Sequence, residues 1–119
     1  MVSIKGLFKT TNWHRRYWKN RKIDWTQAYM TPYHSHRQLI IQALKQFKFT
    51  SVLEVGCAAG ANLYKIKQNF PQVDVGGIDW NADAIETAKK FLVGAAVLQV
   101  GEATDIYISA QGTDIILSD

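Results

Sequence analysis

The chain has 119 residues, of which 47% are hydrophobic and 20% charged, and its single cysteine is Cys57. This length allows one domain at most, and the composition is that of an ordinary soluble globular protein. We expect no membrane span, because no apolar run approaches roughly 18 residues, and no secretion signal at the N-terminus. One cysteine excludes an internal disulfide and agrees with a cytoplasmic location.

The net charge of +4 is unevenly distributed along the chain. Residues 1–48 carry ten basic side chains and one acidic side chain, whereas residues 49–119 carry four basic and nine acidic ones. This asymmetry is compatible with steering of an anionic substrate toward the N-terminal part. It is equally compatible with a basic arm that packs against the acidic remainder of its own chain.

Residues 1–34 form a basic, aromatic segment without a clear period. It contains Trp13, His14, Arg15, Arg16, Tyr17, Trp18 and Trp25. Aromatic and arginine side chains in alternation are able to stack on bases and hold phosphates. They also anchor irregular extensions to a domain, and we favour this interpretation because no nucleic-acid-binding module is recognisable.

A helix is predicted over residues 36–47, after the break at Thr31-Pro32, with Ser35 as its N-cap. Its apolar stripe is predicted to contain Leu39, Ile40, Ala43, Leu44 and Phe47. His34 and His36 are two residues apart, which is not the one-turn spacing of helical metal ligands, so we predict no metal site.

The stretch from Ser51 to Asn62, SVLEVGCAAGAN, predicts a buried strand, a small-residue turn and a helix over residues 61–70. Glycine and alanine in such a turn let the backbone bend sharply and let a ligand approach closely. The helix that follows directs its unpaired N–H groups toward the same place, so we expect a cofactor there. A dinucleotide fingerprint would require glycines where Ala58 and Ala61 stand, and Glu54 also disfavours it.

Three further strands and a helix are predicted after the turn. The strands cover residues 73–79, 95–100 and 113–118; the long helix opens at Asn81 and ends before Gly94, and Asp105–Ala110 is a possible short helix. Asp79 ends the second strand about 20 residues after the turn, where an acid is able to accept both ribose hydroxyls. Glu102 follows the third strand, so three acids are expected along one edge of the sheet.

The sequence Glu54-x-Gly56-x-Ala58-x-Gly60 resembles motif I of class I S-adenosylmethionine-dependent methyltransferases, with Ala58 in place of the middle glycine. The resemblance covers residues 52–119. It implies a cofactor site at Glu54, Gly56, Cys57, Ala58 and Gly60 of the turn, at Asp79 and Trp80, and at Glu102 and Ala103. In that family the turn holds the amino acid part of the cofactor, the acid after the second strand holds the ribose, and the later positions hold the adenine.

The resemblance also suggests catalytic residues and a lid. Asp119 lies where the family places motif IV, beside the transferred methyl group, and His34 is a second candidate base. Residues before motif I form a lid over the cofactor in many relatives, and Tyr17, Trp18, Tyr29 and Tyr33 are candidates for it.

The predicted fold is an α/β, Rossmann-like three-layer sandwich with a parallel sheet in the order 3-2-1-4 and right-handed crossovers. Residues 1–34 are predicted as an extension or lid, and residues 35–119 as a partial cofactor-binding domain. The fourth strand is expected to be a bare edge, which suggests a longer chain or a homo-oligomer covering it.

We expect methyl transfer from S-adenosylmethionine, or binding of its product S-adenosylhomocysteine, with a small-molecule or anionic acceptor. A cofactor-binding fragment without turnover and an NAD- or nucleotide-dependent oxidoreductase are the alternatives.

Overall fold

The structure is a computed structural model, and it describes residues 2–5, 16–17, 19–30, 35–94, 96–101 and 113–118. His34, Glu102, Ala103, Asp119 and the short helix predicted over Asp105–Ala110 lie outside the described residues, as do Trp18 and Tyr33 of the predicted lid. No helix within the described ranges is long and apolar enough to cross a membrane.

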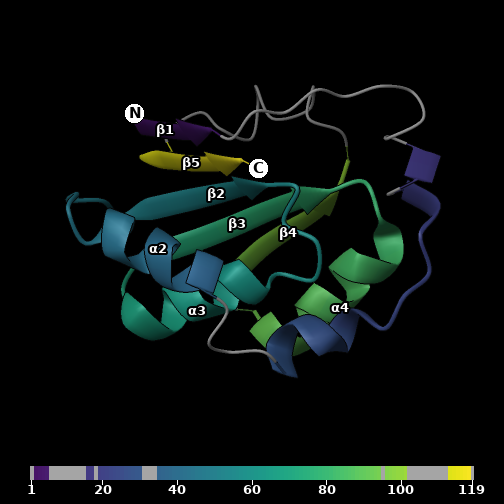
Figure 1. The fold of residues 1–119 in the computed structure, drawn as a ribbon. Coiled ribbons are helices and arrows are strands. Elements are labelled where there is room, and N and C mark those ends of the chain that lie inside the picture. Colours follow the sequence, from purple (N-terminus) through teal and green to yellow (C-terminus); the bar gives the residue numbers. More distant parts are fainter. Residues whose placement is uncertain are drawn as a thin grey trace.

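Five parallel strands form one sheet in the order β1-β5-β2-β3-β4 (Figure 1). The strands are β1 (Val2–Lys5), β2 (Ser51–Val55), β3 (Asp74–Asp79), β4 (Ala96–Val100) and β5 (Ile115–Ser118). The predicted order 3-2-1-4 corresponds to β4-β3-β2-β5 and is confirmed. All four predicted strands form, and their bounds differ from the prediction by at most two residues at one end.

The strand β1 is the feature that the sequence analysis missed. It pairs in parallel with β5, with Val2 opposite Ile115 and Lys5 opposite Ser118. The expectation of a bare edge at β5 is therefore wrong, because the N-terminal residues of the same chain occupy it. Four residues are too few for a hydrophobic period to be recognised, and the surrounding segment is dominated by basic and aromatic residues.

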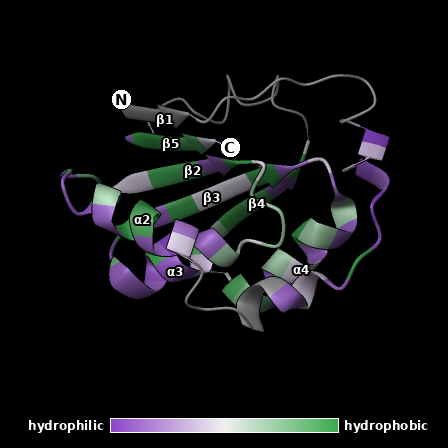
Figure 2. Cartoon of the chain, in the orientation of Figure 1, coloured by the Kyte–Doolittle hydropathy of each residue, from purple (hydrophilic) through white to green (hydrophobic). Residues whose placement is uncertain are grey.

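Three helices lie on one face of the sheet, as Figure 1 shows. They are α2 (Ser35–Leu44), α3 (Ala61–Asn69) and α4 (Ala82–Leu92), and a 3-10 helix, η1 (Trp25–Met30), packs against α4. Figure 2 shows hydrophobic residues along the central strands and hydrophilic ones on the outer sides of the helices. This distribution is expected for helices that bury one stripe against a sheet.

The helix α2 ends earlier than predicted, and its buried stripe agrees with the prediction in part: Leu44 is buried and Ile40 and Ala43 are partly buried. Leu39 is 64% exposed and Phe47 is 40% exposed, whereas Ile41 and Leu44 are buried. The helix stops at Leu44, so Phe47 lies beyond its last turn. Ile41, which the predicted stripe omitted, takes the place in the core that Leu39 was expected to fill.

The helix α4 forms as its sequence predicts. Asn81 caps it by accepting a hydrogen bond from the backbone N–H of Ala84 at 3.0 Å, and the predicted buried residues Ile85, Ala88 and Leu92 are all at most 4% exposed. Burying a side chain the size of isoleucine or leucine contributes roughly 1.5–3 kcal/mol. The helix therefore fixes the end of β3, which precedes it directly.

Candidate functional site

The turn between β2 and α3 bends through three residues with left-handed backbone angles. Gly56, Ala58 and Gly60 have φ angles of 72°, 50° and 81°. The N–H groups of Gly56 and Cys57 both donate to the carbonyl of Ile78 in β3, at 2.8 and 3.2 Å. The turn is thus held against the neighbouring strand, and a Cβ built at Gly56 would have no atom within 4 Å.

Close packing under the turn depends on Gly77, a residue that the sequence analysis did not single out. A Cβ at Gly77 would lie 2.7 Å from the sulfur of Cys57 and 2.8 Å from Cδ1 of Leu63. Neither distance is sterically possible without movement of the turn or of α3. The sequence Gly76-Gly77 within a predicted strand was a usable signal, because glycine in a strand often marks a close approach.

The carboxylate of Asp79 connects the turn to the start of α4. Its Oδ2 accepts a hydrogen bond from the backbone N–H of Ala58 at 2.9 Å, and its Oδ1 accepts one from the N–H of Asn81 at 2.8 Å. Burial raises the pKa of Asp79, and these two hydrogen bonds partly oppose the shift. A carboxylate offers about four acceptor positions, so further donors are able to bind it.

The carboxylate of Glu54 lies at the end of β2, where it is 4% exposed. Its Oε2 accepts a hydrogen bond from the side-chain amide of Asn62, in the first turn of α3, at 2.8 Å. Because Glu54 pairs with Gly77 and Asp79 follows two residues later in the same strand, the two acids lie at the same edge of the sheet. The structure therefore brings together the first two of the three predicted acids.

Cys57 is buried within the turn and is 5% exposed. Burial raises the pKa of its thiol far above the usual range, and the nearby carboxylates of Glu54 and Asp79 raise it further. A thiol in this environment stays protonated, so it is unsuited to nucleophilic chemistry. Its packing against Gly77 agrees with a role as a small filler.

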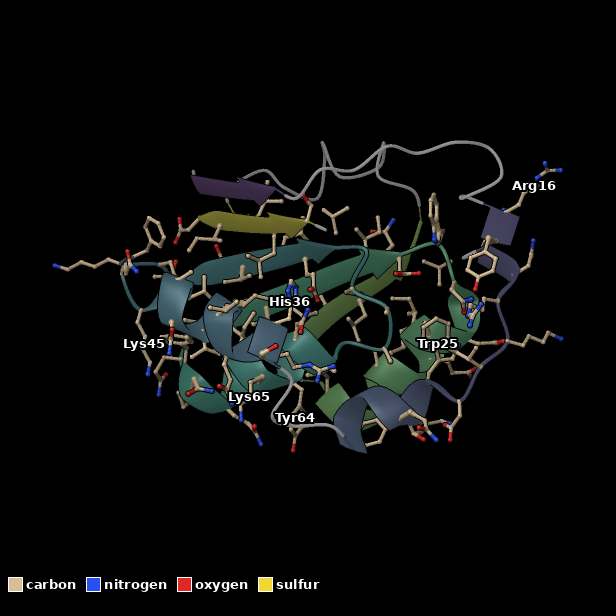
Figure 3. The ribbon with its side chains drawn as sticks, in the orientation of Figure 1. Arg16, Trp25, His36, Lys45, Tyr64 and Lys65 are labelled. Carbon is tan, nitrogen blue, oxygen red and sulfur yellow. The ribbon has the colours of Figure 1, made fainter. Side chains whose placement is uncertain are left out.

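Part of the N-terminal segment lies against the same turn. Trp25 is 9% exposed and packs with Ala59 and Ala84, with Ala58 beside them. Figure 3 shows Trp25 beside α4, and Arg16 farther out with its side chain directed away from the molecule. Trp25 was noted in the sequence as one of several aromatic anchors, but its contact with the turn had no sequence signal.

The predicted residues at the other strand ends are described in part. Trp80 is half-buried directly after β3, and the N–H of Gly101 donates to the carbonyl of Asp79 at 2.9 Å. The residue before Glu102 therefore lies at the edge that carries Asp79. Within the described ranges, no group of three or more histidine, cysteine or acidic residues is arranged to hold a metal ion.

The residues of this edge fit the cofactor implied by the motif. The backbone at Gly56 leaves open space. Two acids lie beside the turn: Glu54 near the end of β2 and Asp79 at the end of β3. Two carboxylates suit a ligand with an ammonium group, a sulfonium and ribose hydroxyls, and they would repel a pyrophosphate held at the turn. The fit therefore favours S-adenosylmethionine over a dinucleotide.

Comparisons with known proteins agree with this geometry. Residues 52–119, more than half of the chain, match the family model described as methyltransferase domain. The O-methyltransferase TomG from Streptomyces achromogenes, solved with S-adenosylmethionine, is similar in fold, with a TM-score of 0.64 at 16% identity over 83% of this chain and 54% of TomG.

The plantazolicin methyltransferase BpumL, solved with a substrate analogue and S-adenosylhomocysteine, has a TM-score of 0.55 at 28% identity, over 84% of this chain and 37% of BpumL. No curated protein matches the chain.

The chain belongs to the methyltransferase domain family, and the predicted resemblance is confirmed. It spans about half the length of TomG. Four of its strands and the helices on one face reproduce the cofactor-binding half of the Rossmann-like fold.

Proposed function

We propose that this chain binds S-adenosylmethionine at the edge formed by the β2–α3 turn and the end of β3, and that the protein transfers its methyl group to an acceptor. The observation that carries the proposal is the hydrogen bond from Ala58 N–H to the Asp79 carboxylate, beside the open backbone of Gly56. It joins the two elements that would hold the amino acid part and the ribose of the cofactor.

Each part of the edge has a role in this proposal. The turn from Gly56 to Gly60 would seat the amino acid part of the cofactor, with Glu54 beneath it facing the ammonium group. The carboxylate of Asp79 keeps acceptor positions free for the ribose hydroxyls. Trp80, Glu102 and Ala103 would contact the adenine.

The bound cofactor supplies an electrophilic methyl group on its sulfonium, so the protein mainly has to orient the partners and exclude water. Proton removal from the acceptor, where it is needed, is assigned to Asp119, and to His34 as the second candidate. Both assignments remain predictions from the sequence.

The acceptor class is a small molecule or an anion. The basic side chains concentrated in residues 1–48 support an anionic acceptor. BpumL, a methyltransferase of this fold, was solved with a desmethylPZN analogue beside S-adenosylhomocysteine. A nucleic acid remains the less favoured partner. The homo-oligomer was predicted in order to cover the edge of β5, and because β1 occupies that edge this reason for it is removed.

Calorimetry with S-adenosylhomocysteine tests the proposal. We expect micromolar binding by the natural chain and a loss of roughly 10- to 100-fold in Asp79→Ala, because a hydrogen bond to a charged group contributes about 1.5–3 kcal/mol. Asp74→Ala is the matched control, since Asp74 is exposed at the other end of β3. Binding of NAD in place of S-adenosylhomocysteine would refute the proposal.

A second candidate, cofactor binding without turnover, is supported by the chain's span of about half of TomG. A methyl-transfer assay with a panel of small anionic acceptors separates the two. Binding of S-adenosylhomocysteine together with no detectable transfer, and transfer by a longer form of the protein, would favour the second candidate.

A further inference from the structure

Hydrogen bonds of Asn81 connect the end of β3, the start of α4 and the N-terminal segment. Its side-chain oxygen accepts from the N–H of Ala84 at 3.0 Å, and its side-chain nitrogen donates to the carbonyl of Arg21 at 2.8 Å. Its backbone N–H donates to the carboxylate of Asp79 at 2.8 Å. Asn81 is 2% exposed; its bond to Ala84 is buried, and its bonds to Asp79 and Arg21 are partly buried.

The capping role alone does not account for asparagine at this position. Serine, threonine and aspartate cap helices about as well, through the same kind of side-chain oxygen. Asparagine differs from them in carrying an amide N–H₂ group that only donates. That donor meets a backbone carbonyl from the N-terminal segment, 60 residues earlier in the chain.

The segment that Asn81 holds is ordered by further contacts. The guanidinium of Arg21 lies 4.7 Å from the ring centre of Tyr17, and the carboxylate of Asp24 accepts a hydrogen bond from the N–H of Thr26 at 3.1 Å as η1 begins. Trp25 then packs against the cofactor turn at Ala58 and Ala59. The segment is thus held at two points: at Arg21 by the hydrogen bond from Asn81, and four residues later at Trp25 by apolar packing on the turn.

We propose that Asn81 is a positioning residue that fixes residues 21–25 as a wall of the cofactor site. Through Asp79 it contacts the carboxylate assigned to the ribose, and through Arg21 it places Trp25 on the turn assigned to the amino acid part of the cofactor. Cofactor binding and the order of the N-terminal segment are therefore coupled. The identity of the ligand rests on the proposed function, whereas the link between Asn81 and the segment does not.

Trypsin cleavage measures the order of this segment, because trypsin cleaves after arginine and lysine and the segment contains Lys19, Arg21 and Lys22. Cleavage in an ordered segment requires local opening, so its rate follows the stability of the contacts that hold the segment. Asn81→Ser keeps a capping oxygen and removes the amide donor. Asn69→Ser is the matched control, since the Asn69 side chain makes one exposed hydrogen bond, to Lys65 in its own helix.

In Asn81→Ser we expect cleavage at residues 21–22 to be roughly 2- to 10-fold faster than in the natural chain, the range that corresponds to one hydrogen bond. Asn69→Ser should be cleaved at the natural rate. Saturating S-adenosylhomocysteine should slow cleavage at residues 21–22 in the natural chain and leave cleavage after Lys89 or Lys90 less affected. Because an opened segment reduces the competent fraction, Asn81→Ser should also bind S-adenosylhomocysteine more weakly.

Equal cleavage rates in Asn81→Ser and the natural chain would overturn the proposal. So would faster cleavage without any protection by S-adenosylhomocysteine and without any change in its affinity, since Asn81 would then be a structural clamp alone. If the natural chain does not bind S-adenosylhomocysteine, the proposed function fails, and the trypsin rates still decide whether Asn81 holds the segment. Thermal unfolding of both serine variants checks that each is folded.

Discussion

The two ends of the central strands each carry an aspartate that accepts hydrogen bonds from backbone N–H groups, and the pKa values of the two aspartates are shifted in opposite directions. At the carboxyl end, Asp79 accepts from Ala58 and Asn81 and is half-buried. At the amino end, Asp114 accepts from both the N–H and the hydroxyl of Thr50, at 2.7 and 2.8 Å, and is partly exposed. The N–H of Asp114 in turn donates to the hydroxyl of Ser51 at 2.9 Å.

The difference appears in the direction of the two pKa shifts. The hydrogen bonds from Thr50 lower the pKa of Asp114, so its charged form is favoured in the folded protein. Burial raises the pKa of Asp79, so its charged form is disfavoured where it stands. A carboxylate whose charged form is disfavoured by burial, next to an open turn, is expected where a bound ligand donates further hydrogen bonds to it. This contrast agrees with an amino end whose contacts stabilise the fold and with the binding role proposed above for the carboxyl end.

The largest expected effect tests the packing beneath the carboxyl end. In Gly77→Ala the new Cβ would lie 2.7 Å from the Cys57 sulfur, so the turn or α3 must move. We expect a loss of about 1–3 kcal/mol in the free energy of unfolding, as for other overpacked cores, together with loss of S-adenosylhomocysteine binding. Urea denaturation and calorimetry measure the two effects.

Gly76→Ala is the matched control for that change. Its Cβ would meet the carbonyl oxygen of Val97 at 3.2 Å and Cδ1 of Leu53, the residue paired with Gly76 in β2, at 3.5 Å, on the face away from the turn. We expect a smaller loss of stability and unchanged binding. Equal effects of the two alanine variants would mean that the turn does not depend on Gly77.

The second effect is the pH dependence of cofactor binding. In the proposed site, the ribose hydroxyls would donate to Asp79 in its charged form, and burial raises the pKa of Asp79. Affinity for S-adenosylhomocysteine should therefore fall as the pH decreases through this raised pKa, at a higher pH than for an ordinary aspartate. Asp79→Asn should bind roughly tenfold more weakly at neutral pH, since a neutral amide forms weaker hydrogen bonds than a carboxylate. It should also lose this pH dependence, and calorimetry across the acid range would reveal a residual slope if another group were responsible.

Most of this fold followed from sequence patterns that repeat over a whole element. The helix α4 has a cap at Asn81, a buried stripe ending at Leu92 and a glycine, Gly94, just beyond its end, and each of these signals is local. The strand β1 has no such redundancy in four residues, so its pairing with β5 depends on long-range contacts that a sequence pattern does not contain. The burial of Ile41 in place of Leu39 was missed for a related reason, because the rotation of a helix on a sheet is set by its neighbours.

For the candidate site, the sequence indicated the residue types and the edge of the sheet. Glu54, the turn and Asp79 were expected together because carboxyl ends of parallel strands share one edge. The hydrogen bond of Asp79 to Ala58 N–H, the contact of Trp25 with the turn and the donor role of Asn81 toward Arg21 were not expected. Each joins residues more than 20 positions apart, and such pairings depend on the three-dimensional packing.

A third prediction uses the opposite signs of the two pKa shifts on stability. The lowered pKa of Asp114 contributes stability that is present above its ordinary value of 3.8 and is lost as the pH falls through the folded-state value. The raised pKa of Asp79 does the reverse, so its contribution is lost as the pH rises through the folded-state value. Urea denaturation from about pH 2 to 7 should show that Asp114→Asn removes the first slope and Asp79→Asn the second. If the free energy of unfolding depended on pH in the same way in both variants, the opposite roles of Asp114 and Asp79 would be refuted.

The smallest expected effect concerns Ala58, whose φ of 50° lies in the left-handed region that favours glycine. A left-handed conformation costs an alanine about 1 kcal/mol, so Ala58→Gly removes strain, but the added freedom of the unfolded chain costs about 0.4–1 kcal/mol. The two terms nearly cancel, and we expect a change in the free energy of unfolding of less than about 0.5 kcal/mol, with binding of S-adenosylhomocysteine retained.

Ala58→Val is the informative contrast, since a β-branched residue is a genuine outlier at this φ. It should weaken binding and stability together, because the Ala58 N–H is the group that holds Asp79. If valine is tolerated, the turn reaches Asp79 through another backbone geometry. The residues at the carboxyl end would then serve the fold and not a ligand, as those at the amino end do.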